Sequence, residues 1–346
     1  MGPLTLVVIL RLSMSAVAQP TVPPDVRKVA YSAEAVRQSV ERAMPQLWKG
    51  MEGHNEVRSC FTCHNHGVPM LALGVARSRG YDVPNEKLQA QIDYITDDLE
   101  RNRTRFEKGM GPGPSPSGGE TDNTGSALLA LAAINYKPDA NTSAVVHYTL
   151  SKDKTQAHWP ARASRAPTEA SSFTTTTLNL RGIQTFGTAG QKALVDKRTE
   201  AAKDWLIKTA AKDTEDRVFR LLGLKTVGAE TDEITKATKE LLSTQREDGG
   251  WGQIDTLPSD AYATGTALYA LHVGGGVATD HPAWRKGVLF LLGTQEEDGT
   301  WHVKSRSRPF QKYYESGFPH VKDQFISCAA TAWATAALAL ATPMKE

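Results

Sequence analysis

The sequence has few cysteines, no excess of either charge and no long hydrophobic run beyond its N-terminus. Only three of the 346 residues are cysteine, so a cysteine motif is unlikely to arise by chance. Forty Lys and Arg against 38 Asp and Glu leave a formal net charge of +2, and no basic run could follow a phosphate backbone. The sequence therefore predicts no nucleic-acid partner and, past the N-terminus, no integral membrane span.

The N-terminus has the features of a secretory signal. Residues 4–10 form a short apolar run, and Ala16-Val17-Ala18 follows the small-x-small pattern of a cleavage site. We expect a signal peptide over residues 1–18, removed after Ala18, and an N-terminal linker over residues 19–30. The mature protein is then expected in the periplasm or outside the cell.

Two kinds of helical segment alternate along the rest of the chain. Runs rich in Ala, Leu, Thr and Gly are apolar nearly all round, which predicts helices buried on both sides. They begin near residues 67, 122, 171, 216, 260 and 323. Amphipathic segments lie between them, over roughly 33–47, 88–99, 140–151, 197–210, 234–242 and 284–291. Acidic or hydroxyl residues at the starts of the apolar runs suit helix N-caps.

The spacing of roughly 45 to 65 residues between apolar runs is typical of helix-pair repeats. An open stack of such pairs would need polar capping repeats, and neither end of the chain has one. The sequence therefore predicts an all-α protein whose residues 31–342 form a single α/α toroid, with six inner and six outer helices in a closed ring.

Two copies of one motif support this fold. Residues 245–251 and 295–301 both read Q-x-x-x-G-x-W, each just before an apolar run. The motif resembles the repeat signature of the squalene-cyclase and prenyltransferase superfamily, whose fold is an α/α toroid. The resemblance implies that the Gln ends an outer helix and that the Trp packs in the following loop. His158-Trp159-Pro160 and Trp48 lie at the same phase without the full motif.

A C-x-x-C-H motif at Cys60, Cys63 and His64 carries the candidate chemistry. Two thiols at this spacing can bind the two vinyl groups of a haem, and the following His can ligate its iron. We expect a covalent haem c on Cys60 and Cys63 with His64 as axial ligand. Two alternatives stay open: a zinc site that adds His66, and a disulfide or redox pair. Cys328, in the last apolar run, is expected to be a buried, unreactive thiol.

The motif lies in a link from an outer to an inner helix, and all such links should emerge at one mouth of the ring. The link over 300–322, dense in Arg, Tyr and His, is the expected lid over this mouth. A sixth iron ligand would be His or Met. The sequence favours His320, and the other candidates are His158, His302, His66 and Met70.

This sequence lacks the motifs that carry the chemistry of the resembled family. No D-x-D-D sequence is present, although squalene-type cyclases take their proton donor from it, and Asp93, Asp97 and Asp98 are expected to face solvent. The Asp-x-Cys zinc ligands of the prenyltransferases are also missing, because Ile326 precedes Ser327 and Cys328. Seven per cent aromatic residues is low for a cavity that stabilises carbocations.

Function is therefore predicted as an exported monohaem c-type protein with an electron-transfer or haem-based redox role. Its redox partner or small-molecule ligand is not specified. The alternative is a toroid enzyme that resembles the cyclases and prenyltransferases or processes glycans, in which the C-x-x-C-H region is a zinc or structural site. In the glycan case Tyr313, Tyr314, His320 and Arg308 would supply base and charge.

Overall fold

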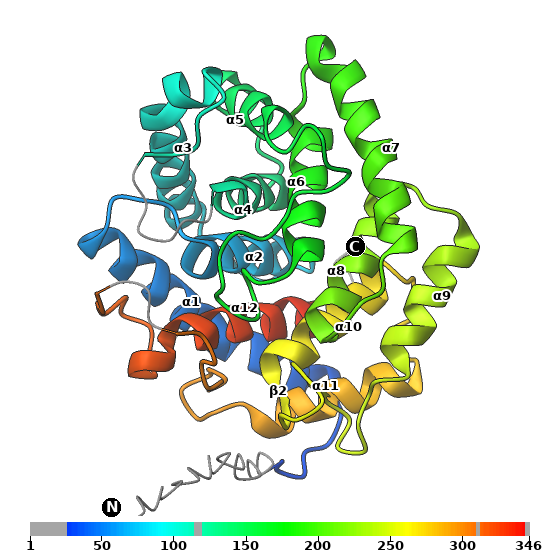
Figure 1. The fold of residues 1–346 in the computed structure, drawn as a ribbon. Coiled ribbons are helices and arrows are strands. Elements are labelled where there is room, and N and C mark those ends of the chain that lie inside the picture. Colours follow the sequence, from blue (N-terminus) through cyan, green and yellow to red (C-terminus); the bar gives the residue numbers. More distant parts are fainter. Residues whose placement is uncertain (1–25, 114–119, 309–311, 343–346) are drawn as a thin grey trace, which may run out of the picture.

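A computed structural model of the protein describes residues 26–113, 120–308 and 312–342, and over these residues it contains twelve α-helices (Figure 1). The even-numbered helices are α2 (Val68–Ser78), α4 (Glu120–Ala133), α6 (Ser172–Phe186), α8 (Thr214–Thr226), α10 (Ala261–Val273) and α12 (Gln324–Leu340). The odd-numbered helices are α1 (Ala33–Val57), α3 (Asn85–Glu107), α5 (Ala140–Ser151), α7 (Lys192–Lys208), α9 (Thr231–Leu242) and α11 (Pro282–Thr294). The all-α prediction is confirmed.

The even-numbered helices form an inner layer in which each packs against the next. Contacts run from α2 through α4, α6, α8 and α10 to α12, and α12 also packs against α2. The odd-numbered helices lie outside this layer, with α3 and α5 on one side and α7 and α9 on the other (Figure 1). Because α12 meets α2, the inner layer leaves no helix with an unpaired side.

The two kinds of helix expected from the sequence are both found. Every residue of α10 from Ala261 to Leu271 is buried, because the helix has neighbours on both flanks and an outer helix behind it. The outer helix α9 buries only Ala237, Thr238 and Leu241, which lie on one face. The burial of α10 and α9 thus agrees with the periodicity of their sequences.

The tryptophans of the repeat motif join the inner layer to the outer one. Trp301 is 1 % exposed; its backbone N–H donates to Oγ1 of Thr331 in α12 at 3.1 Å, and its indole donates to the carbonyl of Leu291 in α11 at 2.9 Å. The same pair of bonds is made by Trp251 with Thr264 and Leu241, and by Trp159 with Thr176 and Thr149. The structural role expected for the motif is confirmed, and Trp159 shares it. Trp48 does not, because it lies inside α1.

Helix caps depart from the prediction at several starts. Asp260 caps α10 by accepting from the backbone N–H of Ala263 at 2.9 Å, as expected. Asp122 and Asp216 instead lie in the first turns of their helices, and Asp213 caps α8. Glu169 precedes α6 and forms an ion pair with Arg165. For these three acids the expected helix starts were two or three residues away from the actual ones, because the start of an apolar run locates a helix end only to within a few residues.

Short irregular elements interrupt the helical pattern. Two-residue strands β1 (Trp251–Gly252) and β2 (Ser259–Asp260) pair antiparallel across the link before α10. Single turns form η1 (Cys63–Gly67, a π-helix), η2 (Ala189–Gln191) and η3 (Val321–Asp323), the last two 3₁₀. The periodicity of the sequence does not predict any of them.

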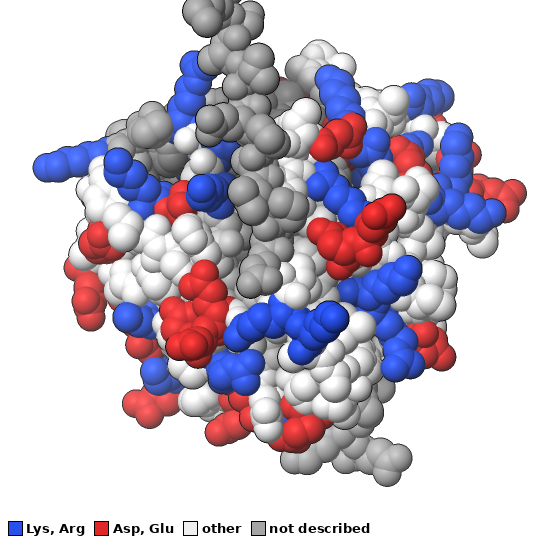
Figure 2. Space-filling view, turned by 90° about the horizontal axis from the view of Figure 1, so that it is seen from below, with Lys and Arg blue, Asp and Glu red and all other residues white. Residues whose placement is uncertain are grey.

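The predicted signal peptide and most of the linker lie outside the described residues. Among the helices that are described, none has the length and hydropathy needed to cross a bilayer. The face seen in Figure 2 carries Lys and Arg interspersed with Asp and Glu.

Gly299→Ala should destabilise the fold. Gly299 has φ +91°, and a Cβ there would collide with the carbonyl oxygen of Arg42. We expect a loss of about 2–4 kcal/mol in the free energy of unfolding, measured by urea titration. Gly276→Ala is the matched control: its φ is +67° but nothing lies within 4 Å of the added Cβ, so about 1 kcal/mol is expected. Equal losses in the two variants would contradict the steric argument.

Candidate functional site

The C-x-x-C-H motif lies where the chain turns tightly into the first inner helix, α2. Its last residues form the π-helical turn η1, which runs directly into α2. Thr62 caps this turn by accepting from the N–H of Asn65 at 3.0 Å, and the amide of Asn65 donates to the carbonyl of Gly50 at 2.9 Å. Single π-turns are rare and often mark functional sites. The turn fixes Cys63 and His64 relative to α1.

The loop before the turn is held by two aromatic side chains. His54 Nε2 bonds to the carbonyl of Cys60 at 2.8 Å, and the hydroxyl of Tyr94 donates to the same carbonyl at 3.2 Å and to that of Arg58 at 2.8 Å. Burial lowers the pKa of His54 to about 4, so the ring is neutral at physiological pH. The Cys60 backbone is therefore fixed from both α1 and α3.

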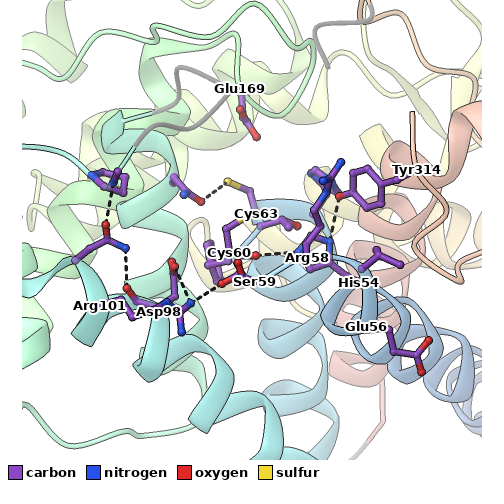
Figure 3. A pocket seen from close by; sticks show the side chains of 18 of the residues that line it. His54, Glu56, Arg58, Ser59, Cys60, Cys63, Asp98, Arg101, Glu169 and Tyr314 are labelled. Atoms are coloured by element: carbon purple, nitrogen blue, oxygen red, sulfur yellow. Dashed lines mark hydrogen bonds and ion pairs between the residues drawn. The ribbon is translucent and has the colours of Figure 1, made fainter. Parts of the chain in front are cut away.

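A pocket of about 710 Å³, here called the mouth pocket, opens beside this segment (Figure 3). Its walls come from α1, the 58–64 loop, α3, the links before α4, α6 and α12, and the start of α4. The lining includes His54, Glu56, Arg58, Ser59, Cys60, Cys63, His64, Asp98, Arg101, Asn102, Asn123, Arg165, Glu169 and Tyr314. The links before α2, α4, α6 and α12 thus meet at one mouth, as expected.

Charges in the mouth pocket occur mostly in pairs. Arg101 pairs with Asp98 at 3.2 Å, Arg165 pairs with Glu169, and the guanidinium of Arg58 lies 4.3 Å from the centre of the Tyr314 ring. The prediction that Asp98 faces solvent is wrong: it is 8 % exposed, because α3 turns this face toward the 58–62 loop. Burial raises the pKa of its carboxyl.

The two thiols and the imidazole of the motif all line the mouth pocket, but they do not converge on a point. Cys60 is exposed and Cys63 buried, and both are free thiols, so no disulfide joins them. Burial raises the pKa of both thiols and lowers that of His64 well below 6.5. His64 Nε2 is enclosed, without a hydrogen-bond partner among the described residues, and its ring lies 4.6 Å from that of Phe325.

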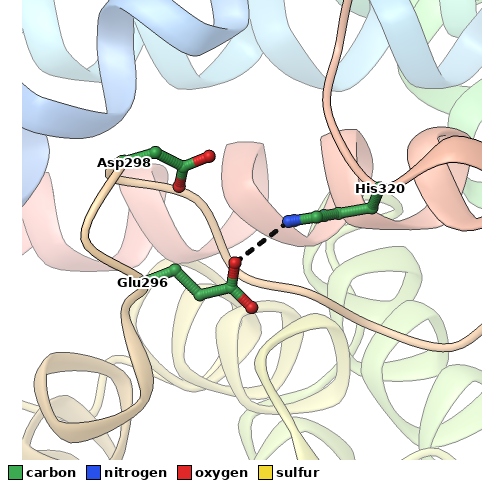
Figure 4. A group of neighbouring side chains, drawn as sticks. All are labelled: Glu296, Asp298 and His320. Atoms are coloured by element: carbon green, nitrogen blue, oxygen red, sulfur yellow. Dashed lines mark hydrogen bonds and ion pairs between the residues drawn. The ribbon is translucent and has the colours of Figure 1, made fainter.

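The zinc alternative at this motif does not fit the geometry. His66 bonds through Nε2 to Asn55 at 2.8 Å and accepts from the N–H of Thr62 at 3.3 Å, which turns it away from the thiols. Among the described residues, the group of three or more possible metal ligands that the structure brings together is a different one, consisting of Glu296, Asp298 and His320 (Figure 4).

His320, the favoured sixth iron ligand, lies in this second group and not in the mouth pocket. Its Nε2 is 3.1 Å from Glu296 Oε2 and 3.3 Å from Thr300 Oγ1, and its ring stacks on that of His302 at 4.5 Å. The loop over 300–322 carries it toward the end of α11, and of the residues described in that loop only Tyr314 lines the mouth pocket.

The other sixth-ligand candidates are also placed elsewhere. His158 stacks on Trp205, His302 pairs with Asp323 at 2.8 Å, and Met70 is buried within α2. The group proposed for a glycan site is not assembled, because Tyr314 lines the mouth pocket whereas His320 lies beside Glu296. Cys328 is fully buried and burial raises the pKa of its thiol, as expected of an unreactive cysteine.

A second, smaller cavity of about 30 Å³ lies inside the inner layer, here called the axial cavity. All six inner helices or their immediate starts contribute to it. Its lining is Cys63, His64, Gly67, Val68, Ser126, Leu129, Thr168, Thr174, Leu178, Glu215, Phe219, Tyr262 and Trp333. Cys63 and His64 line both cavities, so they separate the mouth pocket from the axis.

The axial cavity is lined by a buried acid, Glu215, that was not predicted from the sequence. Glu215 is 3 % exposed, yet the sequence drew attention only to its neighbour Asp216. His54, Tyr94 and Arg165 were missed as well, because nothing in their local sequence distinguishes them. For Glu215 a signal existed: three acids at 213, 215 and 216 open one apolar run.

Comparison with known proteins assigns the fold to a family. The sequence profile of the squalene-hopene cyclase C-terminal domain matches residues 121–346, about two thirds of the chain. The chain belongs to this family. It is 38 % identical over 114 residues to the squalene–hopene cyclase of Bradyrhizobium diazoefficiens and 35 % identical over 99 residues to a probable one of Sinorhizobium fredii. These matches cover 29 % and 25 % of this chain but only 16 % and 14 % of the two relatives.

Solved structures of the cyclase fold cover nearly the whole chain. The type II terpene cyclase MstE from Scytonema, in complex with its substrate geranylgeranyl dihydroxybenzoate, aligns with a TM-score of 0.56 over 90 % of this chain and 99 % of its own. A protein from Actinoplanes aligns with a TM-score of 0.57 over the same shares. Identities of 15 % and 14 % show that the likeness is one of fold.

These findings overturn the predicted function. The electron-transfer function of a c-type cytochrome rested on five residues, whereas the family match and the fold extend over most of the chain and are those of terpene cyclases. The classification of the chain as a c-type cytochrome is therefore wrong. The assignment of Cys60, Cys63 and His64 as cofactor-binding residues, and the exported location, stay predictions.

Intact-mass measurement decides what the thiols carry. In a host that attaches haem, purification and denaturation should leave either the bare chain mass or a mass increased by one haem, and Cys60→Ala with Cys63→Ala removes any such addition. The same spectrum identifies the mature N-terminus. A covalent haem would confirm the cofactor residues, while a bare chain in a competent host would rule them out.

Proposed function

We propose that this chain is a cyclase-like enzyme that acts on an isoprenoid-class substrate, in a single toroid of six inner and six outer helices. The observation that carries the proposal is the axial cavity, which all six inner helices surround. Three of its lining residues, Phe219, Tyr262 and Trp333, are aromatic, and Phe219 and Trp333 meet edge to face at 6.2 Å. Aromatic faces stabilise positive charge in a site without water.

The overall scarcity of aromatic residues therefore counts less than their positions. The sequence has nine Tyr, nine Phe and seven Trp, and three of these meet at the axis. Carbocation chemistry needs aromatic faces only around the reacting carbon atoms.

The sizes of the two cavities determine how a substrate would lie. A pocket of about 710 Å³ is within the range of sites that hold small molecules, whereas about 30 Å³ has room for one or two waters. The bulk of the substrate would occupy the mouth pocket, and only its alkenyl end would pass Cys63 and His64. Leu129 and Leu178 must rotate to admit that end.

Two features distinguish this proposal from the prenyltransferase and haem-protein alternatives. The prenyltransferase alternative lacks its zinc ligands, since Cys328 is fully buried in α12. The mouth pocket is open to a substrate only if Cys60 and Cys63 carry no prosthetic group. The proposal therefore expects the bare chain mass, and a covalent haem would contradict it. The matched regions make up only about a sixth of the two relatives. The substrates of those proteins therefore indicate a substrate class for this chain and no particular substrate.

Binding through the mouth pocket can be tested with two probes, squalene and geranylgeranyl dihydroxybenzoate. Tryptophan fluorescence should report saturable binding of at least one, since Trp333 lines the axial cavity. Ser59→Trp places a large side chain at an exposed position of the mouth pocket and should weaken binding about tenfold, which corresponds to roughly 1.4 kcal/mol.

Ser78→Trp is the matched control, because Ser78 is equally exposed but lies at the far end of α2, away from the mouth pocket. Its affinity should stay within about twofold of the wild type. The proposal fails if neither probe binds, or if Ser59→Trp and Ser78→Trp bind alike.

A further inference from the structure

The axial cavity is lined by an acid, Glu215, that belongs to no known cyclase motif. Glu215 is the second residue of α8, a helix capped by Asp213, which accepts from the N–H of Asp216 at 3.0 Å. One residue along a helix turns the side chain by about 100°, so neighbours face different ways. Asp216 therefore turns toward Ser171, 2.7 Å away, while Glu215 points to the axis.

Two hydroxyl groups fix the carboxyl of Glu215. Thr174, from α6, donates to Oε1 at 2.8 Å. Tyr262, from α10, lies 3.2 Å from Oε1 and 3.1 Å from Oε2. The acid is thus held by the inner helices on either side of α8, in the wall of a cavity whose opposite side is formed by other inner helices.

The surroundings keep this acid protonated near neutral pH. Burial, with a smaller contribution from the negative charges of Asp213 and Asp216, raises the pKa of Glu215 to about 8, although the hydrogen bonds from Thr174 and Tyr262 act in the opposite direction. At pH 7 most molecules therefore carry a carboxylic acid here, which can donate a proton.

We propose that Glu215 is the proton donor of this enzyme, placed on α8 in a chain that has no D-x-D-D motif. The proposal rests on the function proposed above and names its catalytic residue. The position agrees with the geometry such a donor needs: it lies inside the ring, with Phe219 one turn along α8 and Tyr262 in hydrogen-bond contact, in a cavity that Trp333 also lines.

The step balances without any co-reactant. The O–H bond of Glu215 breaks as its proton forms a C–H bond with one carbon of the terminal alkene, and the other carbon becomes a cation. An internal alkene attacks the cation and forms a C–C bond. The resulting cation loses a proton from a neighbouring C–H bond to water, and water returns a proton to the Glu215 carboxylate. Substrate and product are isomers.

Asp122 provides a matched control. It also lies in the first turn of an inner helix, is 4 % exposed, and has a pKa raised by burial. Its carboxyl accepts from Thr175 and does not line the axial cavity. If burial of an acid near the mouth were enough for catalysis, Asp122 would matter as much as Glu215.

The test measures conversion of squalene and of geranylgeranyl dihydroxybenzoate, with products identified by mass spectrometry. Glu215→Gln keeps the shape but cannot donate the proton, so conversion should fall at least about a hundredfold. Asp122→Asn should stay within about threefold. In heavy water the wild-type product should gain one deuterium. Because the protonated form is active, wild-type conversion should decline as the pH rises through about 8.

The unfolding equilibrium gives a second readout that needs no substrate. The folded pKa of Glu215 lies above its unfolded value, so its contribution to stability is full below about pH 4.5 and is lost as the pH rises through about 8. The decline in the urea midpoint over this window should be smaller in Glu215→Gln than in the wild type.

The outcomes separate the two proposals. Wild type that converts neither probe overturns the proposed function, and this inference with it. Active wild type with an equally active Glu215→Gln overturns only the inference. An equal loss in Asp122→Asn, or the same pH dependence of stability in Glu215→Gln and wild type, also counts against Glu215 as the donor.

Discussion

The contact of α12 with α2 is the constraint on which the rest of the structure depends. Inner helices such as α10 are apolar on every side, so each needs a neighbour on both flanks. Packing the last inner helix on the first meets that need for all six without polar capping repeats. Closure also brings residues far apart in the chain to one axis: Cys63 and Trp333 line the same cavity.

Close packing of the inner helices sets the size of that cavity. At Gly265 in α10 an added Cβ would lie 2.7 Å from the backbone of Ala334 in α12, and at Gly223 in α8 it would lie 2.6 Å from Thr177 in α6. Helices that approach so closely leave little room at the axis. The larger of the two spaces is found where the chain enters the inner layer, around Cys60 and His64, so the candidate site consists of two cavities with Cys63 and His64 between them.

The C-x-x-C-H motif shows how far a short pattern can be taken. Its position in a link before an inner helix was enough to place Cys60, Cys63 and His64 at the mouth of the ring, where they line one pocket. It could not place a sixth ligand, because His320 depends on the course of a long loop, and that loop leads to Glu296 instead. A function drawn from five residues also carried less information than the pattern of helices over the whole chain, which identifies the cyclase family.

The sequence by itself determined the helices, their alternation and the packing of Trp251 and Trp301 between the layers. These features depend on residues close together in the chain, so periodicity and repeat motifs reveal them. It left open which buried polar residues meet. Glu215 and Asp216 are adjacent acids at one helix start, and only the rotation of α8 in the closed ring brings the first to Tyr262 and the axis. Tertiary structure decided the site because its members come from separate repeats, and their contact depends on ring closure.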